Sequence, residues 1–225
     1  RLRLVAVSDV HLGNGTTRKD LARYVDMINS ENPDMVLIVG DLIDNSILPV
    51  ESADMCREFE RVKARYGIYM VAGNHEYISG IDACRNYLKT TPVQLLSDSV
   101  ARPANGVAIV CRDDRQNPRR AKLDSLLTES DKGSFMVVLD HQPNAIAESQ
   151  KNSIDLHISG HTHRGQVFPL NILTDHLFEQ SHGHRMWGDM HAYVMTGVSL
   201  WGPPFRIGTR SELLVVDIVS SAVAE

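Results

Sequence analysis

The sequence is poor in cysteine and has no long hydrophobic run. Its three cysteines, Cys56, Cys84 and Cys111, are odd in number and outside any C-x-x-C pattern, which excludes a disulfide framework or a thiolate zinc site. We expect them to be small buried hydrophobes. No uninterrupted apolar stretch approaches the about 20 residues that a membrane-spanning helix needs. Acidic residues outnumber basic ones, and the formal net charge of −5 argues against a broad nucleic-acid surface.

The chain is long enough for one large domain with a substantial core. Its 225 residues are 43% hydrophobic and 23% charged, which is typical of a soluble globular protein. A single α/β domain commonly has about 250 residues, so we expect residues 1–225 to form one domain. The sequence begins at Arg1 without an initiator Met and enters an apolar strand pattern at once, so we also expect it to be cut from a longer chain.

The first half alternates strand patterns with amphipathic helix patterns. The apolar run 35–39, bounded by a proline and a glycine, is typical of a buried parallel strand, and Asp41 follows it. Alone, Asp41 would be interpreted as a helix or turn cap. Asp9 lies 32 positions before Asp41, and Asn74 lies 33 positions after it, close to the length of one β-α-β unit. Equivalent strand ends meet at one edge of a sheet, so we expect these side chains to be neighbours.

Histidines occupy similar positions. Asp9 and His11 stand at i and i+2, and His161 and His163 repeat that spacing just after a glycine. In extended backbone this spacing places both side chains on one side, where they can share an ion. His157 lies inside an alternating pattern and is interpreted as an ordinary strand residue.

The second half is predicted to be less regular. Asn105-Gly106 is a strong hairpin signal and predicts antiparallel pairing, and His141 follows another apolar strand pattern. Residues 165–191 show no clear period and are expected to form a long surface loop. Among the helices expected along the chain are those over 52–65 and 118–127.

Eight polar side chains thus follow strands or glycines, and their types indicate metal chemistry. They are too many for one tetrahedral ion, and carboxylate, amide and imidazole groups without thiolate suit Mn, Fe or Zn. Two ions that share a carboxylate would use the whole set, which predicts a two-metal hydrolase. The eight are Asp9, His11, Asp41, Asn74, His75, His141, His161 and His163.

These residues fall in five ordered blocks: Asp9-Val10-His11, Gly40-Asp41, Gly73-Asn74-His75-Glu76, His141 and Gly160-His161-Thr162-His163. In type and order they resemble the signature of the calcineurin-like metallophosphoesterases, D-x-H, G-D, G-N-H-[DE], a lone H and G-H-x-H. The blocks span about two-thirds of the chain, so the match is specific. The resemblance implies an α/β (α+β) fold, a four-layer α/β/β/α sandwich of two mixed β-sheets flanked by helices, with metals at the strand ends.

The resemblance also implies a reaction. A hydroxide that bridges the two ions would attack phosphorus in line. His75 would contact the phosphate and protonate the leaving oxygen, and Glu76 would orient His75. Asp44 would either support the ligands or act as a cap, and the cap is the favoured interpretation. The implied ligands are Asp9, His11 and His163 for one metal, Asn74, His141 and His161 for the other, and Asp41 as the bridge.

Departures from other branches of the family narrow the substrate. No arginine follows Gly40-Asp41 as in the protein phosphatases, so a phosphoprotein substrate is not expected. Asp44 stands where purple acid phosphatases place a tyrosine, so a tyrosinate–iron site is not expected. The segments 160–166 and 201–208 look like a bacterial phosphodiesterase branch that includes membrane-anchored enzymes. We expect hydrolysis of a phosphodiester or pyrophosphate bond. The alternatives are a nuclease of the same fold and a scaffold that has lost catalysis.

The resemblance further implies cofactors and partners. We expect two divalent ions, with Mn first and Fe or Zn as alternatives. The expected substrate is a phosphate ester, either lipid-linked or containing a nucleotide, and nucleic acid is not expected. We expect a monomer. The location is left open, with a bacterial protein held at a membrane by a segment absent from this sequence as the working hypothesis. Trp187, Trp201, Pro203 and Phe205 are hypothesised to form an apolar rim for a lipid-linked substrate, the alternative being turn packing.

Overall fold

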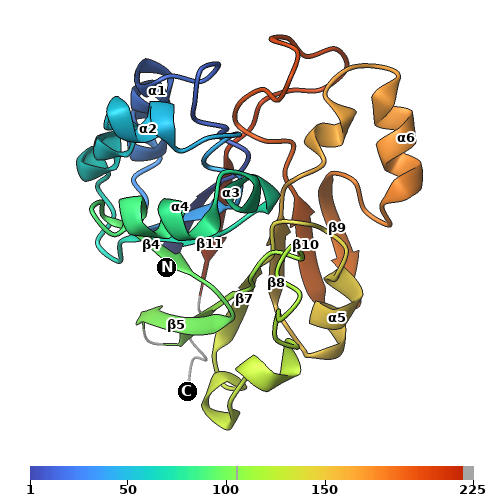
Figure 1. Cartoon of the computed structure of the whole chain (residues 1–225). Coiled ribbons are helices and arrows are strands. Elements are labelled where there is room, and N and C mark those ends of the chain that lie inside the picture. The colour runs from blue at the N-terminus through green and yellow to red at the C-terminus, as the bar shows by residue number, and fades with distance from the viewer. Residues whose placement is uncertain (105, 220–225) are drawn as a thin grey trace.

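The computed structural model describes residues 1–104 and 106–219. Within this part of the chain the strands form two sheets that pack face to face, with helices outside them (Figure 1). The five strands of the first sheet are, in spatial order, β11 (Leu214–Ile218), β1 (Leu2–Val7), β2 (Met35–Val39), β3 (Ile68–Val71) and β4 (Val93–Leu96). The six strands of the second sheet are β5 (Ser99–Ala104), β6 (Val107–Cys111), β7 (Phe135–Leu139), β8 (Leu156–Ser159), β10 (Met190–Val194) and β9 (Gly183–Trp187).

Short helices cover the outer faces of the sheets. The α-helices are α1 (Arg18–Ser30), α2 (Leu48–Ser52), α3 (Asn74–Ile78), α4 (Ile81–Leu88), α5 (Ile146–Lys151) and α6 (Leu170–Leu177). The 3₁₀ turns are η1 (Met55–Arg61), η2 (Asp124–Leu126), η3 (Glu129–Asp131) and η4 (His163–Gly165). The first sheet packs against α1, α2, η1 and α4, and the second packs against α5 and η2. Each sheet mixes parallel and antiparallel pairs. The predicted four-layer α/β/β/α sandwich is confirmed.

Strand β2 shows why a strand of the first sheet can consist of apolar residues alone. All of its residues are buried, because alternate side chains face the second sheet and the helices. A strand covered on both faces has no polar side, so its sequence is a continuous apolar run. Its neighbours β1 and β3 run parallel to it, and the carboxyl ends of these strands therefore lie at one edge of the sheet.

Two predicted helices differ in the described residues, where Met55–Arg61 forms the 3₁₀ helix η1 in place of one long helix and 118–127 is mostly irregular. A single helix over 52–65 is wrong, because Asp54 adopts a left-handed φ of 44° between α2 and η1. Over 118–127 only the short turn η2 forms. There two backbone N–H groups bond to distant side chains: that of Ala121 donates to Asp98 at 2.7 Å and that of Leu123 donates to Glu148 at 3.0 Å. These long-range bonds replace the helical ones, which a local pattern does not reveal.

The region 165–191 is more ordered than predicted. It contains α6 and β9, and β10 begins at its end, so the expectation of a long surface loop is wrong. Strands β9 and β10 pair antiparallel and extend the second sheet. Helix α6 lies at the edge of the molecule, away from β11 (Figure 1).

Three smaller predictions are confirmed. Strands β5 and β6 pair antiparallel, although Asn105, on which the hairpin prediction rests, lies outside the described residues. The three cysteines are buried and free. His157 is a buried residue of β8 whose ring nitrogens each lie 2.8 Å from a serine hydroxyl, those of Ser149 and Ser159.

Candidate metal centre

The candidate ligands lie in the loops that follow strands of both sheets. Asp9 follows β1, Asp41 follows β2, and Asn74 begins α3 just after β3. From the second sheet, His141 follows β7 and the segment 161–163 follows β8. The N–H of Asp9 donates to the carbonyl of the glycine before Asp41 at 3.1 Å, which holds two of these loops together. The two sheets thus present polar groups at one shared edge.

The structure brings these side chains within ligand distance of one another. The Nε2 atoms of His11 and His163 are 3.1 Å apart, and His141 Nε2 lies 3.0 Å from Asp41 Oδ2. Asp41 also has a carboxylate oxygen within 4.8 Å of ligand atoms of His11 and His75, so it faces both halves of the cluster. Two further groups of three have ligand atoms within 4.8 Å of one another: Asp9, His11 and His163, and Asp41, His141 and His161.

Some polar atoms of this cluster lack a partner. Asn74 Oδ1 and His163 Nδ1 are buried and make no hydrogen bond in the described structure. Native proteins rarely leave buried polar atoms unpaired, because each costs free energy. The opposite nitrogen of His141, Nδ1, lies 2.9 Å from the carbonyl oxygen of Val39, which leaves Nε2 to face Asp41. Metal-ligating histidines commonly bond a carbonyl oxygen through one ring nitrogen, as His141 does, and bind the metal through the other. A divalent cation in the cluster would also supply partners for the unpaired buried atoms.

Burial and neighbouring charges set the protonation of the cluster. Burial lowers the pKa of His163 to about 4, and burial together with His141 lowers the pKa of His161. Both imidazoles are therefore neutral near pH 7, the form that binds a metal. Burial favours the neutral form of Asp41, but the imidazole of His141 beside it outweighs this and holds the pKa of Asp41 well below its usual range. Against the effect of burial, the carboxylate of Asp41 in turn raises the pKa of His141 well above its usual value, so metal binding would displace a proton from His141. Carboxylate and imidazole donors without thiolate suit Mn, Fe or Zn.

Five of the candidate ligands have left-handed backbone. The φ angles lie between 47° and 72° at Asp9, His11, Asp41, His161 and His163. Such values are uncommon outside glycine, and they persist only where the surrounding structure holds them. The prediction that the i, i+2 pairs share one side of an extended strand is wrong, because all four residues have left-handed backbone. Asp9 and His11 nevertheless fall in one ligand group, whereas His161 and His163 fall in two different ones. Strained residues of this kind gather at functional sites.

Two motif glycines leave room for these side chains. A Cβ atom at Gly73 would lie 2.2 Å from Asp41 Oδ1, and one at Gly40 would lie 2.4 Å from His141 Nδ1. Gly40 also has a φ of +75°, which favours glycine on conformational grounds. The glycines of the G-D and G-N-H blocks are therefore steric requirements of the candidate ligands.

Glu76 differs from its predicted role. Its fully buried carboxylate accepts the backbone N–H groups of Gly73 at 2.7 Å, Ile43 at 2.9 Å and Asp41 at 3.0 Å. All three of these bonds go to backbone, so Glu76 clamps the loops after β2 and β3 together. Burial and the charge of Asp41 raise the pKa of Glu76 to about 7. The expectation that Glu76 orients His75 finds no support in these contacts.

The carboxylate that contacts the ring of His75 is that of Asp44, not that of Glu76. Asp44 Oδ1 lies 3.2 Å from His75 Nδ1 and 3.4 Å from His11 Nδ1. The favoured interpretation of Asp44 as a cap is therefore wrong, since its side chain faces two imidazoles. The backbone N–H of His75 donates to Asp41 Oδ1 at 2.9 Å, which fixes the start of α3 beside the cluster. The only signal of this role in the sequence is the position of Asp44, three residues after Asp41.

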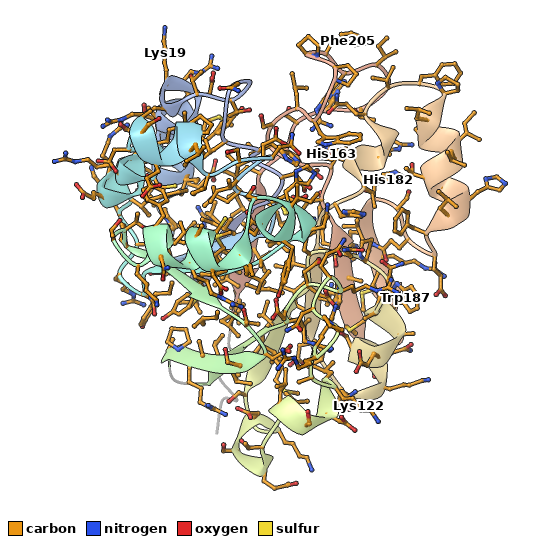
Figure 2. All side chains as sticks on the ribbon, viewed as in Figure 1. Lys19, Lys122, His163, His182, Trp187 and Phe205 are labelled. Carbon is orange, nitrogen blue, oxygen red and sulfur yellow. The ribbon has the colours of Figure 1, made fainter. Side chains whose placement is uncertain are left out.

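The centre opens into two hollows. A pocket of about 220 Å³ is lined by the cluster together with Thr174, Phe178 and Trp201. A larger one of about 920 Å³ shares His11 and His75 with it and extends toward the start of α1. Figure 2 shows His163 inside the outline of the molecule and Phe205 at its periphery, at the top of the view.

Trp187 does not belong to this opening. Figure 2 shows it toward α5, away from His163. Its indole N–H donates to Gln180 at 2.8 Å, and its ring packs against the buried cluster outside the second sheet. The inclusion of Trp187 in the hypothesised rim is therefore wrong, whereas Trp201 and Phe205 are exposed.

A two-sheet sandwich with carboxylates and imidazoles gathered at its strand ends defines a candidate metalloenzyme of the α/β/β/α class. Residues 2–165 match the family model of the calcineurin-like phosphoesterases, and the chain belongs to that family. The predicted resemblance is confirmed.

Two relatives show how far the similarity extends. An uncharacterized metallophosphoesterase of Helicobacter pylori strain J99 is 32% identical over 97% of this chain and 60% of its own length. A Danio rerio transmembrane protein with metallophosphoesterase domain is 34% identical over 94% of this chain and 52% of its own length. The chain thus spans about half to three-fifths of these curated relatives. Within residues 1–104 and 106–219, no helix combines the length and apolar character needed to cross a bilayer.

Solved structures agree on the fold. The structure of TT1561 from Thermus thermophilus has a TM-score of 0.57, is 12% identical, and covers 86% of this chain and 88% of its own. A dimetal phosphatase from Danio rerio has a TM-score of 0.51 at 13% identity, and it covers 87% of each chain. At these identities the likeness concerns the fold alone.

Proposed function

We propose that this chain is a dinuclear metal-dependent phosphoesterase that hydrolyses a phosphodiester or pyrophosphate bond. The observation that carries the proposal is the position of Asp41. Its carboxylate lies within 4.8 Å of ligand atoms of His11 on one side and of His141 and His161 on the other. A carboxylate flanked by two sets of imidazoles is the arrangement in which two cations share one ligand. Each predicted ligand position is filled, which favours an enzyme over a scaffold.

Two of the side-chain groups support the proposed ligand sets, and the family resemblance adds Asn74 to the second of them. Mn is the proposed ion, with Fe or Zn as alternatives for the same donors. When bound, the ions would supply positive charge that polarises the phosphoryl group and acidifies the attacking water. The proposed ligands are Asp9, His11 and His163 for one ion, Asn74, His141 and His161 for the other, and Asp41 for both.

His75 is proposed to hold and deliver the proton of the reaction. It is buried beside the cluster, and its Nδ1 faces Asp44 Oδ1. The hydrogen bond with His11 lowers the pKa of Asp44, so Asp44 is ionised and its carboxylate can accept from His75 Nδ1 and orient the ring. The other ring nitrogen of His75 is then free to protonate the leaving oxygen of the substrate.

Metal analysis combined with turnover tests the proposal. The purified protein is reconstituted separately with Mn, Fe and Zn, and hydrolysis of bis-p-nitrophenyl phosphate and p-nitrophenyl phosphate is measured for each. We expect two metals per chain and faster hydrolysis of the diester. Less than one metal per chain together with no turnover would favour the scaffold.

Three variants test the assignment of residues. Asp41→Asn should weaken both metal sites, whereas Asp9→Asn should weaken mainly one. His75→Ala should keep both metals and lose most of the turnover. Loss of the metals in His75→Ala would mean that His75 is itself a ligand.

A membrane setting is the second part of the proposal. The Danio rerio and Bos taurus relatives are both named transmembrane proteins with a metallophosphoesterase domain, and the chain spans 52% of each. We therefore place the domain beside a membrane, where its phosphate-ester substrate is lipid-linked or contains a nucleotide. Fractionation of cells that express the full-length protein tests this, and recovery only in the soluble fraction would contradict it.

A further inference from the structure

Two exposed apolar segments lie beside the opening of the candidate metal centre. Helix α6 contains no buried residue, and its Leu173 and Leu177 are 54% and 66% exposed. In the loop 199–208, Trp201 and Phe205 are 51% and 50% exposed. Single exposed apolar residues are common, but a group of this kind marks a binding surface. We call α6 and the loop 199–208 together the apolar face.

Gln166 joins the two segments of the apolar face. Its side-chain amide donates to the carbonyl oxygens of Trp201 at 2.7 Å and Pro203 at 2.9 Å. Its side-chain oxygen accepts the N–H of Trp201 at 2.8 Å. Just before α6, Val167 pairs with Ile207 in an isolated bridge. The apolar face is therefore one connected surface, and both of its parts stand at the same end of the molecule (Figure 1).

The centre of the apolar face carries no charge. Residues 165–174 and 199–205 contain no Asp, Glu, Lys, Arg or His. The exposed Asp175 and His176 stand in the last turn of α6, where Asp175 accepts a hydrogen bond from Ser181. The neighbouring Arg206 directs its guanidinium inward, where it donates to the carbonyl oxygen of Thr196 at 2.8 Å. The face therefore presents mainly aliphatic and aromatic side chains to its surroundings. Large aliphatic residues with Trp and Phe beside them suit the boundary between lipid headgroups and acyl chains.

The apolar face also forms part of the opening itself. Thr174 and Phe178 from the α6 side, and Trp201 from the loop, line the same pocket as His161 and His163. Whatever covers the face must therefore present its own groups to the metal centre. A protein partner or a second copy would close the opening. A lipid bilayer instead carries phosphate esters in its headgroups, just above the depth that apolar side chains reach.

We propose that the apolar face is a membrane-docking surface, which holds the opening of the metal centre against the headgroups of a lipid bilayer. The proposal rests on the proposed phosphoesterase function and adds the source of its substrate, a phosphate ester at a bilayer surface. Docking requires no spanning helix, because α6 and the loop reach only into the interfacial layer.

Vesicle co-sedimentation tests the docking directly. The purified protein is mixed with vesicles of phosphatidylcholine, alone or with an anionic lipid added, and the bound fraction is measured. We expect Leu173→Asp and Phe205→Asp to lower the partition coefficient about tenfold or more, because a carboxylate enters an apolar layer poorly. Met27→Asp is the matched control, since Met27 is 49% exposed on α1, away from the apolar face, and it should bind like the wild type. Circular dichroism and metal content confirm that each variant is folded.

The outcomes separate the possible occupants of the face. No vesicle binding by the wild type would overturn the proposal. If light scattering shows a dimer that Leu173→Asp dissociates, with no vesicle binding, the occupant is a second copy and the proposal is wrong. Turnover of soluble bis-p-nitrophenyl phosphate by the wild type is measured in parallel. Turnover without vesicle binding would overturn only the docking, and vesicle binding without turnover would overturn only the phosphoesterase function.

Discussion

Replacement of Glu76 separates a structural role from a catalytic one. Its carboxylate is the acceptor for three buried backbone N–H groups, those of Gly73, Ile43 and Asp41. Glu76→Ala leaves all three without an acceptor, and each buried unsatisfied donor costs about 1–3 kcal/mol. The combined loss of about 3–9 kcal/mol approaches the whole stability of an ordinary domain, about 5–15 kcal/mol. We therefore expect Glu76→Ala to be largely unfolded or unable to retain metals.

Glu76→Gln is the sharper variant. The N–H groups of Gly73 and Asp41 share one carboxylate oxygen, so the glutamine oxygen can still accept both. Its amide group would then face the N–H of Ile43, which loses its acceptor. We expect the free energy of unfolding to fall by about 1–3 kcal/mol, measured by urea denaturation, with the metals retained. Turnover should fall much less than in His75→Ala, because the ring of His75 is held by another carboxylate.

A matched control and a contrary result complete this test. Glu60→Gln alters an exposed glutamate of η1 and should leave both the unfolding free energy and turnover unchanged. If Glu76→Gln unfolds at the wild-type urea concentration yet turns over as slowly as His75→Ala, Glu76 acts on the chemistry and the clamp is the wrong explanation.

Further variants probe other parts of the structure. Asp44→Asn should keep the metals and lower kcat about 10–100-fold, because it weakens the support of two imidazoles; an unchanged kcat would contradict this. Gly73→Ala should reduce metal content, since its Cβ would lie 2.2 Å from Asp41, whereas Gly15→Ala, with open space around its Cβ, should not. Burial lowers the pKa of His157 to about 3, so in metal-free protein stability should fall as pH drops from about 6.5 toward 3. The free energy of unfolding should change by at most about 1.4 kcal/mol per pH unit from this one group. In urea denaturation, His157→Gln should show a smaller change with pH than the wild type.

Much of the fold was predictable because burial on both sides leaves a clear pattern. The continuous apolar run of β2 and the regular spacing of Asp9, Asp41 and Asn74 reflect parallel strands with equal crossovers. The candidate ligands were predictable because they follow strands or glycines in the order of the metallophosphoesterase signature. The structure gives a steric reason for two of those glycines, since side chains packed against Gly40 and Gly73 leave no room for a Cβ.

The features that were missed depend on long-range contacts. In the segment 118–127, distant side chains accept the backbone N–H groups of Ala121 and Leu123, which a continuous helix would pair within itself. The contact of Asp44 with two histidines requires the loop after β2 to meet residues from other strands. No local pattern encodes these two arrangements. Helix α6 is different, because Leu170, Leu173 and Leu177 do recur at helical spacing, but over only eight residues, none of which is buried.

Asp41 connects the stability of the fold to the chemistry of the site. Its backbone N–H is held by Glu76, its carboxylate holds the N–H of His75, and the same carboxylate faces His141 from the other sheet. Its φ of 52° is strained for a residue with a side chain, and these bonds are what maintain it. A cation bound to Asp41 would reinforce the same geometry, because metal binding free energy adds to folding free energy. The strain at the strand ends is therefore held by the two sheets together, and the site depends on both of them.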